Sequence, residues 1–421
     1  MIPPGPGLVN SERPPGERSK LRAGMGLKAD ILKVGDALVG WPIAVLLAPF
    51  ARRRARGPGP ESGPGPEPGQ GSTGAVPPPP RRALVIRPGG IGDAVLFLPM
   101  LAELRRAWPQ AEIDLLVEKR NSGVVRGLGL VDRVLLYDRL TGDLPRALAT
   151  RYDVVIDTEQ YHRASAIVAF LTGAPRRIGF GTNVRRRLLT DPLPYDQSIY
   201  EARSFLELAR RATGREPHWD PEQPFLPLDP DAVRFADEAL APLGDRPLVA
   251  IHPGASIPER RWPPERYAEV AARLAGEGIG IVVLGGREDE KPAAVIAARL
   301  AGQPVVNVAG KSTLAQAAAI VAKVDVYASA DTGVLHLAYA VGTRTVHLFG
   351  PGVLSKWGPP GHRFRSIAAD APCSPCTVYG YTPPCNQGNV CMLRIEPERV
   401  AREVMAQLEV SGRVARGAGS A

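Results

Sequence analysis

The sequence predicts an α/β protein built from two doubly wound parallel sheets. Over two long stretches of the 421-residue chain, short apolar runs typical of strands alternate with segments of helical periodicity. This alternation is typical of βαβ units, whose parallel sheet is covered by helices on both faces. A proline-rich and charged stretch, residues 213–246, separates the two halves. We therefore expect a ligand in the cleft between the halves, at the carboxyl ends of the strands.

The N-terminal half, residues 82–212, is expected to fold around five strands. These strands are predicted at residues 83–87, 113–117, 133–137, 153–157 and 177–181, and the last is expected to close the sheet. After the connector, residues 247–396 contain four predicted strands, at 248–252, 279–285, 324–329 and 344–350. Their helices are predicted at 264–276, 288–301, 313–323 and 334–341. Residues 397–421 supply a last amphipathic helix, over 397–409, and the tail.

The charge of the chain is concentrated at its start. The net charge is +9, of which residues 1–82 contribute +6 and the other 339 residues only +3. Hydrophobic residues make up 44% and charged residues 23%, which is ordinary for a soluble globular protein. This distribution argues against nucleic acid as the main partner and for a basic arm beside an anionic surface.

The leader, residues 1–81, is expected to be disordered apart from one apolar stretch. Residues 37–51 are uncharged, and four arginines follow within the next five positions. These 15 residues, two of them proline, are fewer than the roughly 20 that span a bilayer. A signal peptide would carry its charges before the apolar run. The stretch could be an interfacial anchor on anionic lipid, a helix packed on the body or a weakly ordered arm. Residues 57–80, of which 16 are glycine or proline, are predicted to form a linker.

The first motif follows the first strand. Gly89, Gly90 and Gly92 form a tight turn before a helix, and Asp93 stands at its end. Glycines let a ligand approach the backbone, and a helix start offers free N–H groups to an anion. Asp93 could equally be a helix cap, and a glycine turn is often purely structural. Because GGIGD is not the dinucleotide fingerprint G-x-G-x-x-G, a nicotinamide-dependent enzyme is the weaker interpretation.

The second motif is HPGASIPERRWPPERYAEV, residues 252–270. Ser256 lies in the turn after a strand, and Arg260 and Arg261 precede a helix start. Guanidinium groups beside a helix start suit a diphosphate. Taken alone, the pair could be solvated arginines that flank a helix.

The third motif is SADTGVLHLAYAVGTRTVHLFGP, residues 329–351. Asp331, Thr332 and Gly333 lie where a strand meets a helix, whose first N–H groups are free for phosphate or sugar oxygens. His336 would point toward the same ligand, although a lone histidine is more often a packed residue. Elsewhere, Glu288 could accept hydrogen bonds from ribose hydroxyls or simply favour a helix dipole.

All the cysteines of the chain lie within 19 residues: Cys373, Cys376, Cys385 and Cys391. Their spacing, C-x2-C-x8-C-x5-C, could hold a structural zinc, because CxxC is half of a zinc knuckle. Two disulfides and four free thiols are the alternatives, and nothing else indicates a secreted protein. The D-x-D triplet that starts at Asp229 lies in the proline-rich connector and is a poor metal site. We therefore expect chemistry that requires no metal.

Together, in this order, the three motifs resemble those of glycosyltransferase family 9, the ADP-heptose:lipopolysaccharide heptosyltransferases. The resemblance covers about residues 82–410 and starts from LVIRPGGIGDAVLFLPMLAELRRAWPQAEIDLLV. It implies a GT-B fold, in which the N-terminal half holds the acceptor and the C-terminal half the nucleotide-sugar. It also implies an inverting transfer that needs no metal cofactor.

The resemblance assigns a role to each motif. Asp93 matches the carboxylate taken as the catalytic base, and the glycines beside it form the acceptor-side loop. The matching donor-binding positions are Ser256, Arg260, Glu288, Ser312, Asp331, Thr332, Gly333 and His336. Arg260 stands where these enzymes often carry a lysine, and Ala255 where some carry a hydroxyl. The donor could therefore differ from ADP-heptose.

The implied partners are a nucleotide-sugar and a lipid-linked or lipopolysaccharide-type glycan, with no nucleic acid. The implied location is the cytoplasm, with a peripheral place on the inner face of the cytoplasmic membrane as an option. Two other functions stay open: a NAD- or nucleotide-sugar-dependent Rossmann enzyme, and a non-catalytic envelope-assembly scaffold of the same fold. Cofactor binding would mark the first, and a scaffold would keep its cellular role when Asp93 is replaced by asparagine.

Overall fold

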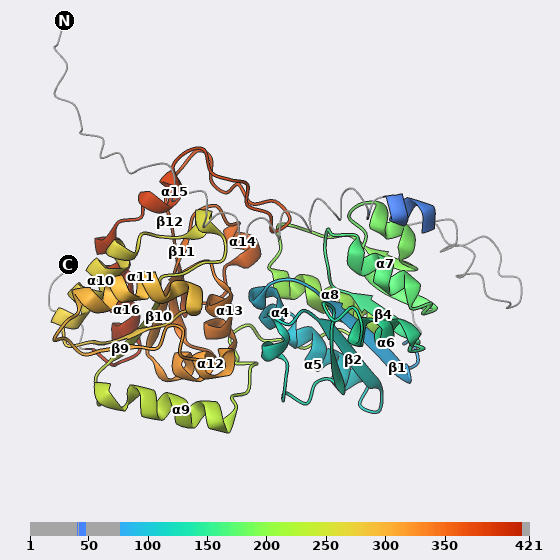
Figure 1. Ribbon diagram of the computed structural model, residues 1–421, viewed down its shortest axis with the longest axis horizontal. Helices are drawn as coiled ribbons and strands as arrows, with labels where there is room; N and C mark the ends of the chain where they lie inside the picture. The colour runs from blue at the N-terminus through green and yellow to red at the C-terminus, as the bar shows by residue number, and fades with distance from the viewer. Residues whose placement is uncertain (1–39, 41, 48–75, 415–421) are drawn as a thin grey trace, which may run out of the picture.

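Two parallel six-stranded sheets form two lobes that lie side by side (Figure 1). The computed structural model describes residues 40, 42–47 and 76–414. The N-terminal lobe contains the sheet β3-β2-β1-β4-β5-β6 and the C-terminal lobe the sheet β12-β11-β10-β7-β8-β9. Each sheet reverses its strand order once, between β1 and β4 and between β7 and β10. The predicted class, two doubly wound α/β sheets, is confirmed. Most of the leader lies outside the described residues.

In the N-terminal lobe the strands are β1 (Arg82–Arg87), β2 (Glu112–Val117), β3 (Arg133–Leu136), β4 (Val154–Asp157), β5 (Arg176–Phe180) and β6 (Asp191–Leu193). Its helices are α4 (Ile91–Leu96), α5 (Leu98–Ala107), α6 (Asp143–Ala149), α7 (Ala164–Leu171) and α8 (Glu201–Thr213), with 3-10 turns η2 (Ser122–Val124) and η3 (Val184–Leu188).

In the C-terminal lobe the strands are β7 (Leu248–His252), β8 (Gly280–Val283), β9 (Val305–Asn307), β10 (Val326–Ala330), β11 (Arg344–Phe349) and β12 (Phe364–Ala368). Its helices are α9 (Pro230–Leu240), α10 (Pro264–Gly276), α11 (Glu290–Arg299), α12 (Leu314–Lys323), α13 (Gly333–Ala340), α14 (Leu354–Trp357), α15 (Val390–Leu393) and α16 (Pro397–Val410), with 3-10 turns η4 (Ala241–Leu243), η5 (Pro258–Arg260) and η6 (Arg287–Asp289).

Three short strands were not predicted from the sequence: β6, β9 and β12. The expectation that residues 177–181 close the N-terminal sheet is wrong, because β6 pairs with β5 beyond them. β6 has three residues and includes Pro192, which an edge strand tolerates because only one side of it is paired. β9 and β12 are edge strands too, and both are partly exposed. β6 and β9 have only three residues each, too few to show an alternation that a sequence pattern could reveal.

The connector contains helix α9. Asp229 caps this helix by accepting a hydrogen bond from the N–H of Asp231 (2.8 Å), and Pro230 occupies the first helical position. The D-x-D triplet is thus a helix start. Ala236 and Leu240 join the large apolar cluster of the molecule, and α9 packs on α12 of the C-terminal lobe.

Part of the apolar stretch of the leader is packed on the N-terminal lobe. Residues 42–47 form a short helix beside α7, where Ala44 and Phe170 belong to one small apolar cluster (Figure 1). Of the three interpretations of residues 37–51, a helix packed on the body therefore describes 42–47. Ile43 and Leu46 remain 37% and 69% exposed. None of the helices in the described ranges is both long and apolar enough to cross a bilayer.

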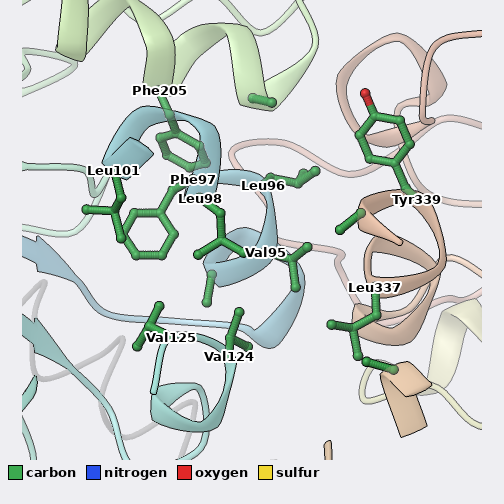
Figure 2. Close-up of a cluster of buried hydrophobic side chains, with 14 of the residues drawn as sticks. Val95, Leu96, Phe97, Leu98, Leu101, Val124, Val125, Phe205, Leu337 and Tyr339 are labelled. Atoms are coloured by element: carbon green, nitrogen blue, oxygen red, sulfur yellow. The ribbon is translucent and has the colours of Figure 1, made fainter. Parts of the chain in front are cut away.

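One apolar cluster joins the two lobes. Val95 and Leu96 on α4 and Leu337 and Tyr339 on α13 are buried members of it (Figure 2). Each of these helices follows a central strand of its sheet, α4 after β1 and α13 after β10. Burial of this surface therefore turns the carboxyl ends of the central strands toward each other. In doubly wound sheets, ligands bind in the crevice at that point.

Candidate functional site

Asp93 occupies the first turn of α4, where it follows the glycine turn after β1. Gly89 has φ +111°, a backbone conformation that favours glycine, and its N–H donates to Glu118 Oε1 (3.0 Å). Asp93 does not cap α4, because the N-cap position is Gly90. Its side chain is 20% exposed, and its Oδ1 has no hydrogen-bond partner among the residues that the structure describes. This Oδ1 is buried, so the carboxylate keeps an unused hydrogen-bond acceptor inside the site.

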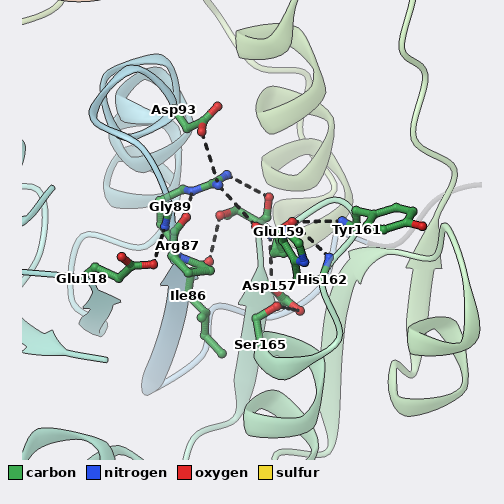
Figure 3. A network of polar contacts seen from close by, with 12 residues as sticks. Ile86, Arg87, Gly89, Asp93, Glu118, Asp157, Glu159, Tyr161, His162 and Ser165 are labelled. Carbon is green, nitrogen blue, oxygen red and sulfur yellow. Dashed lines mark hydrogen bonds and ion pairs between the residues drawn. The ribbon is translucent and has the colours of Figure 1, made fainter. Parts of the chain in front are cut away.

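Arg87, the last residue of β1, holds the carboxylate of Asp93 from behind (Figure 3). Its Nη2 lies 3.8 Å from Asp93 Oδ2 and 3.6 Å from Glu159 Oε2. The buried guanidinium also donates to the carbonyls of Pro88 (2.8 Å) and Thr158 (3.1 Å). With four partners from two loops, Arg87 has little freedom to move and fixes where Asp93 can lie.

A second buried ion pair supports the loop after β4. Asp157 pairs with Arg185 of η3, both side chains are fully buried, and the Ser165 hydroxyl donates to Asp157 (3.0 Å). Loss of either partner would leave a buried uncompensated charge, at a cost of about 3–5 kcal/mol. Burial alone would raise the pKa of Glu159, but the positive charges of Arg87, His162 and Arg185 lower it below its usual range. The loop therefore keeps an ionised Glu159 against Arg87.

On the C-terminal lobe, Arg260 meets Asp331. Arg260 stands at the end of η5 in the loop after β7, and Asp331 directly follows β10. Arg260 Nη1 lies 2.8 Å from Asp331 Oδ2, and Nη2 donates to the hydroxyl of Thr382 (3.4 Å). The Nε of Arg260 is buried and has no acceptor within the described part of the chain. This guanidinium can therefore take a further anionic ligand.

The start of α13 lies beside this ion pair. Thr332 caps the helix by accepting a hydrogen bond from the N–H of Leu335 (3.3 Å). His336 is buried in the first turn, and its Nδ1 has no partner in the ranges that the structure covers. Burial lowers the pKa of His336 although Asp331 and Asp93 oppose the change, so the imidazole is neutral at pH 7.

Two glycines bring the lobes into contact at the site. A Cβ on Gly92 would lie 2.6 Å from Cδ2 of His336, and a Cβ on Gly333 would lie 3.0 Å from Cβ of Ile91. Neither glycine has a positive φ, so both are required for space and not for backbone conformation. The carboxylate of Asp93 is next to this contact, and its charge acts on His336. The first turns of α4 and α13 thus face each other directly.

The other candidate donor residues lie at the same edge of the C-terminal sheet but outside this buried group. Ser256 follows β7 and is exposed, Glu288 follows β8 and is exposed, and Ser312 follows β9 and is half-buried. The structure brings Asp93, Arg260, Asp331 and His336 together and does not place these three in contact with them.

A buried hydrogen-bonded group supports the loops after β7 and β8. His252 Nε2 lies 3.1 Å from Asp289 Oδ2, and its Nδ1 lies 3.2 Å from the hydroxyl of Tyr327. Asp289 also accepts from the N–H of Gly286 (2.9 Å). Burial opposes ionisation of Asp289, but the hydrogen bond from His252 and the nearby charges lower its pKa. This group ties together the loops that carry Ser256 and Glu288.

The cysteines do not form an evident metal centre. Cys373, Cys376, Cys385 and Cys391 are all free thiols. Within the described ranges, no three His, Cys, Asp or Glu side chains are arranged to hold a metal ion. The zinc and disulfide interpretations of this segment therefore gain no support.

Sequence reasoning missed two residues that support Asp93, Arg87 and Glu159. Arg87 ends a strand and looks like a solvated flank, and Glu159 is an ordinary loop residue in the sequence. The one signal that could have pointed to Glu159 is its place after the β4 run, since residues there lie at the carboxyl edge of a parallel sheet.

Comparisons with known proteins identify the family of this chain. A family model described as glycosyltransferase family 9 (heptosyltransferase) matches residues 142–385, which is more than half of the chain. Lipopolysaccharide heptosyltransferase 2 of Salmonella typhimurium is 26% identical, over 79% of this chain and 99% of that protein. Lipopolysaccharide heptosyltransferase 1 of Pseudomonas aeruginosa is 24% identical, over 78% and 98%. The solved ADP-heptose lps heptosyltransferase II of E. coli has a TM-score of 0.64 and 24% identity, over 79% of this chain and 99% of that one.

Proposed function

This chain belongs to glycosyltransferase family 9, and we propose that it transfers a sugar from a nucleotide-sugar to a hydroxyl of an envelope glycan. ADP-heptose is the first candidate donor, and a lipid-linked or lipopolysaccharide-type glycan is the acceptor. The reaction inverts the anomeric carbon and requires no metal. The observation that carries the proposal is the meeting of the first turn of α4, which carries Asp93, with the turn of Asp331 to His336 in the C-terminal lobe, where Arg260 pairs with Asp331. The relatives with heptosyltransferase names support the choice of donor and acceptor.

Asp93 is the general base of the proposed reaction. Its carboxylate takes the proton of the acceptor hydroxyl while the hydroxyl oxygen attacks the anomeric carbon of the donor. Arg87 and Glu159 keep the carboxylate in place from the side away from the donor lobe. In this scheme residues 82–212 bind the acceptor.

The C-terminal lobe, residues 247–396 in the proposed domain division, stabilises the leaving nucleoside diphosphate. As the bond between sugar and diphosphate lengthens, negative charge grows on the diphosphate. Arg260, which has a free Nε, and the N–H groups at the start of α13 are placed to offset that charge. When the diphosphate engages Arg260, Asp331 is released to accept hydrogen bonds from sugar hydroxyls.

The remaining donor contacts follow the loops of the C-terminal sheet. We assign Ser256 to the phosphates, Glu288 to the ribose and Ser312 to the base. The turn of Thr332, Gly333 and His336 contacts the sugar and the phosphates, with His336 as a neutral hydrogen-bonding group. Exposure of Ser256 and Glu288 fits residues that a bound nucleotide would cover.

The donor assignment is tested by calorimetry with ADP-heptose, a GDP-sugar and a UDP-sugar. We expect ADP-heptose and ADP to bind, and transfer to a lipopolysaccharide-core acceptor to yield a product whose NMR spectrum shows an inverted anomeric centre. Binding of a GDP- or UDP-sugar alone would refute the proposed donor. Binding of NAD with no binding of any nucleotide-sugar would favour a Rossmann oxidoreductase.

Gly92→Ala is expected to lower kcat about 100-fold, because the new methyl group would push His336 and the donor turn away from Asp93. Affinity for ADP, measured by calorimetry, is expected to stay within about twofold, because the nucleotide binds to one lobe. Gly123→Ala is the matched control, since a Cβ there would meet nothing within 4 Å. Normal turnover by the Gly92 variant would show that the contact between the lobes is not needed for transfer.

We further propose that the surface around residues 42–47 contacts the inner face of the cytoplasmic membrane. Exposed Leu46 lies on this helix, which packs on α7, and α7 ends at Leu171, itself 46% exposed. Arg186 and Arg187, both exposed, belong to η3, which packs on α7. Apolar side chains beside basic ones are the combination that binds anionic lipid surfaces.

Leu46→Asp is expected to weaken binding to anionic phospholipid vesicles about tenfold or more, because it removes an exposed leucine that would enter the lipid and adds a charge that anionic lipid repels. Co-sedimentation with vesicles of mixed phosphatidylglycerol and phosphatidylcholine measures the effect. Val410→Asp, an exposed site on α16 of the other lobe, is the control. Equal vesicle binding by both variants would refute this surface.

A further inference from the structure

A lysine of the C-terminal lobe is buried inside the N-terminal lobe. Lys356 stands on the short helix α14, yet its Nζ donates to the carbonyl of Asp196 (2.8 Å) and to the hydroxyl of Ser204 (2.9 Å). Nζ also pairs with Glu201 Oε2 (2.7 Å). Lys356 is 3% exposed and Glu201 is fully buried. All three partners belong to the segment that leads into α8 and to its first turns.

The pocket that receives this ammonium is complete. Besides its three oxygen partners, Nζ lies 4.1 Å from the ring centroid of Tyr195. The hydroxyl of Tyr195 donates to Glu201 Oε2 (2.8 Å), so the same carboxylate oxygen is held from two sides. An ammonium has three donors, and here each has an acceptor while the aromatic ring covers the charge. The site thus matches the ammonium that the C-terminal lobe delivers to it.

A second residue of the C-terminal lobe docks on the same segment. Tyr379 stacks on Tyr195 (centroids 5.9 Å apart) and on Tyr161 (4.9 Å). Its N–H donates to Gln197 Oε1 (3.0 Å). Residues 195–204 therefore contact the C-terminal lobe at two points, at Lys356 and at Tyr379.

The lysine pocket adjoins the proposed catalytic carboxylate on one side and the donor turn on the other. Helix α4, which carries Asp93, packs on α8, which carries Glu201. Burial raises the pKa of Glu201 to about 7, an effect that Lys356 opposes and the charge of Asp93 increases. Toward the donor turn, a Cβ on Gly352, four residues before Lys356, would lie 2.7 Å from Asp331 Oδ2. Lys356 is thus linked to both halves of the site, to Asp93 through the packing of α8 on α4 and to Asp331 through Gly352.

We propose that Lys356 is a positioning residue that holds the lobes in the arrangement in which Asp93 faces the donor turn. If the lobes separated, the ammonium would leave its pocket and Glu201 would stay buried without a cation. The ion pair therefore favours the closed arrangement over the open one. This inference rests on the proposed transferase function for its kinetic effect, but not for its effect on the contact between the lobes.

The test compares Lys356→Met, which keeps the length of the side chain, with Lys356→Arg, which keeps its charge. For the methionine variant we expect kcat to fall about 100-fold while the affinity for ADP stays within about twofold. We also expect faster amide hydrogen exchange at residues 88–93 and 331–336, which face each other only when the lobes are closed. The arginine variant is expected to recover part of kcat and of the protection. Lys323→Met, which removes a lysine paired with Asp237 within one lobe, is the matched control.

The double variant Lys356→Met with Glu201→Gln separates positioning from stability. The double variant leaves no buried unpaired charge, so its Tm is expected to return near that of the unmodified protein. It can therefore replace the single variant in the same measurements if Lys356→Met does not fold. We expect its kcat to stay low and its exchange at the two turns to stay fast. Full recovery of kcat and of protection from hydrogen exchange in the double variant would overturn the proposal. Unchanged kcat and unchanged protection in Lys356→Met would overturn it too. If the unmodified protein transfers no sugar, the proposed function fails, while hydrogen exchange still decides whether Lys356 holds the lobes together.

Discussion

Asp93→Asn is expected to lower kcat by about 10²- to 10⁴-fold, the usual contribution of a positioned general base. Asparagine has nearly the same shape as aspartate, but its amide cannot take the proton of the acceptor hydroxyl. The affinity for ADP is expected to be unchanged, since the nucleotide is proposed to bind on the other lobe. Steady-state transfer kinetics and calorimetry on the same preparation measure the two quantities.

Glu207→Gln is the matched control for this prediction. Glu207 is an exposed carboxylate on α8 of the same lobe and pairs only with neighbouring Arg210 in the described structure. Its loss is expected to leave kcat within about twofold, as for a surface ion pair. A kcat of Asp93→Asn within tenfold of the unmodified protein would exclude Asp93 as the base. An unchanged cellular role of that variant would favour a scaffold.

Arg260→Gln is expected to lower kcat about 10²- to 10³-fold, because it removes a positive charge aimed at the leaving diphosphate. It also leaves Asp331 buried without its cation, since the two side chains lie 2.8 Å apart. The affinity for ADP is expected to fall about tenfold or more, in line with the loss of a charge-assisted hydrogen bond. Transfer kinetics and calorimetry with ADP measure both effects.

Arg260→Lys tests whether charge alone is enough at this position. A lysine is expected to retain more activity than a glutamine, since it keeps the charge but loses the two-pronged geometry of the guanidinium. Arg299→Gln, an exposed arginine on α11, is the control. Unchanged affinity of the glutamine variant for ADP would show that Arg260 does not bind the diphosphate.

The central strands and the turns after them could be predicted from the sequence, because their signals are local. β1, β7 and β10 are mostly apolar runs, and the turn after each carries glycine or aspartate in a recognisable pattern. The edge strands β6 and β9 could not be predicted, because three residues such as Asp191–Leu193 show no periodicity and depend on a neighbouring strand. Helix α9 was not predicted, because it lies in the stretch that was interpreted as a proline-rich connector. Its Pro230 nevertheless occupies the first helical position, which proline favours.

The supporting residues of the site escaped prediction for a different reason. Arg87 contacts Glu159, and Lys356 contacts Glu201, across long stretches of sequence and, for the lysine, across two lobes. A buried arginine or lysine is unusual, and composition favours a solvated face for each. Only the folded structure shows that each of these two cations pairs with a buried carboxylate.

The pair of glycines at the interface limits how parts of this protein can be exchanged with those of relatives. Gly92 is needed because of His336, and Gly333 because of Ile91, so each lobe restricts the sequence of the other. A chimera that joins one lobe to a foreign partner must therefore inherit the first turns of α4 and α13 as a matched set. A chimera that is joined at the boundary between the lobes, without matching these two turns, would have two well-folded lobes that cannot pack against each other.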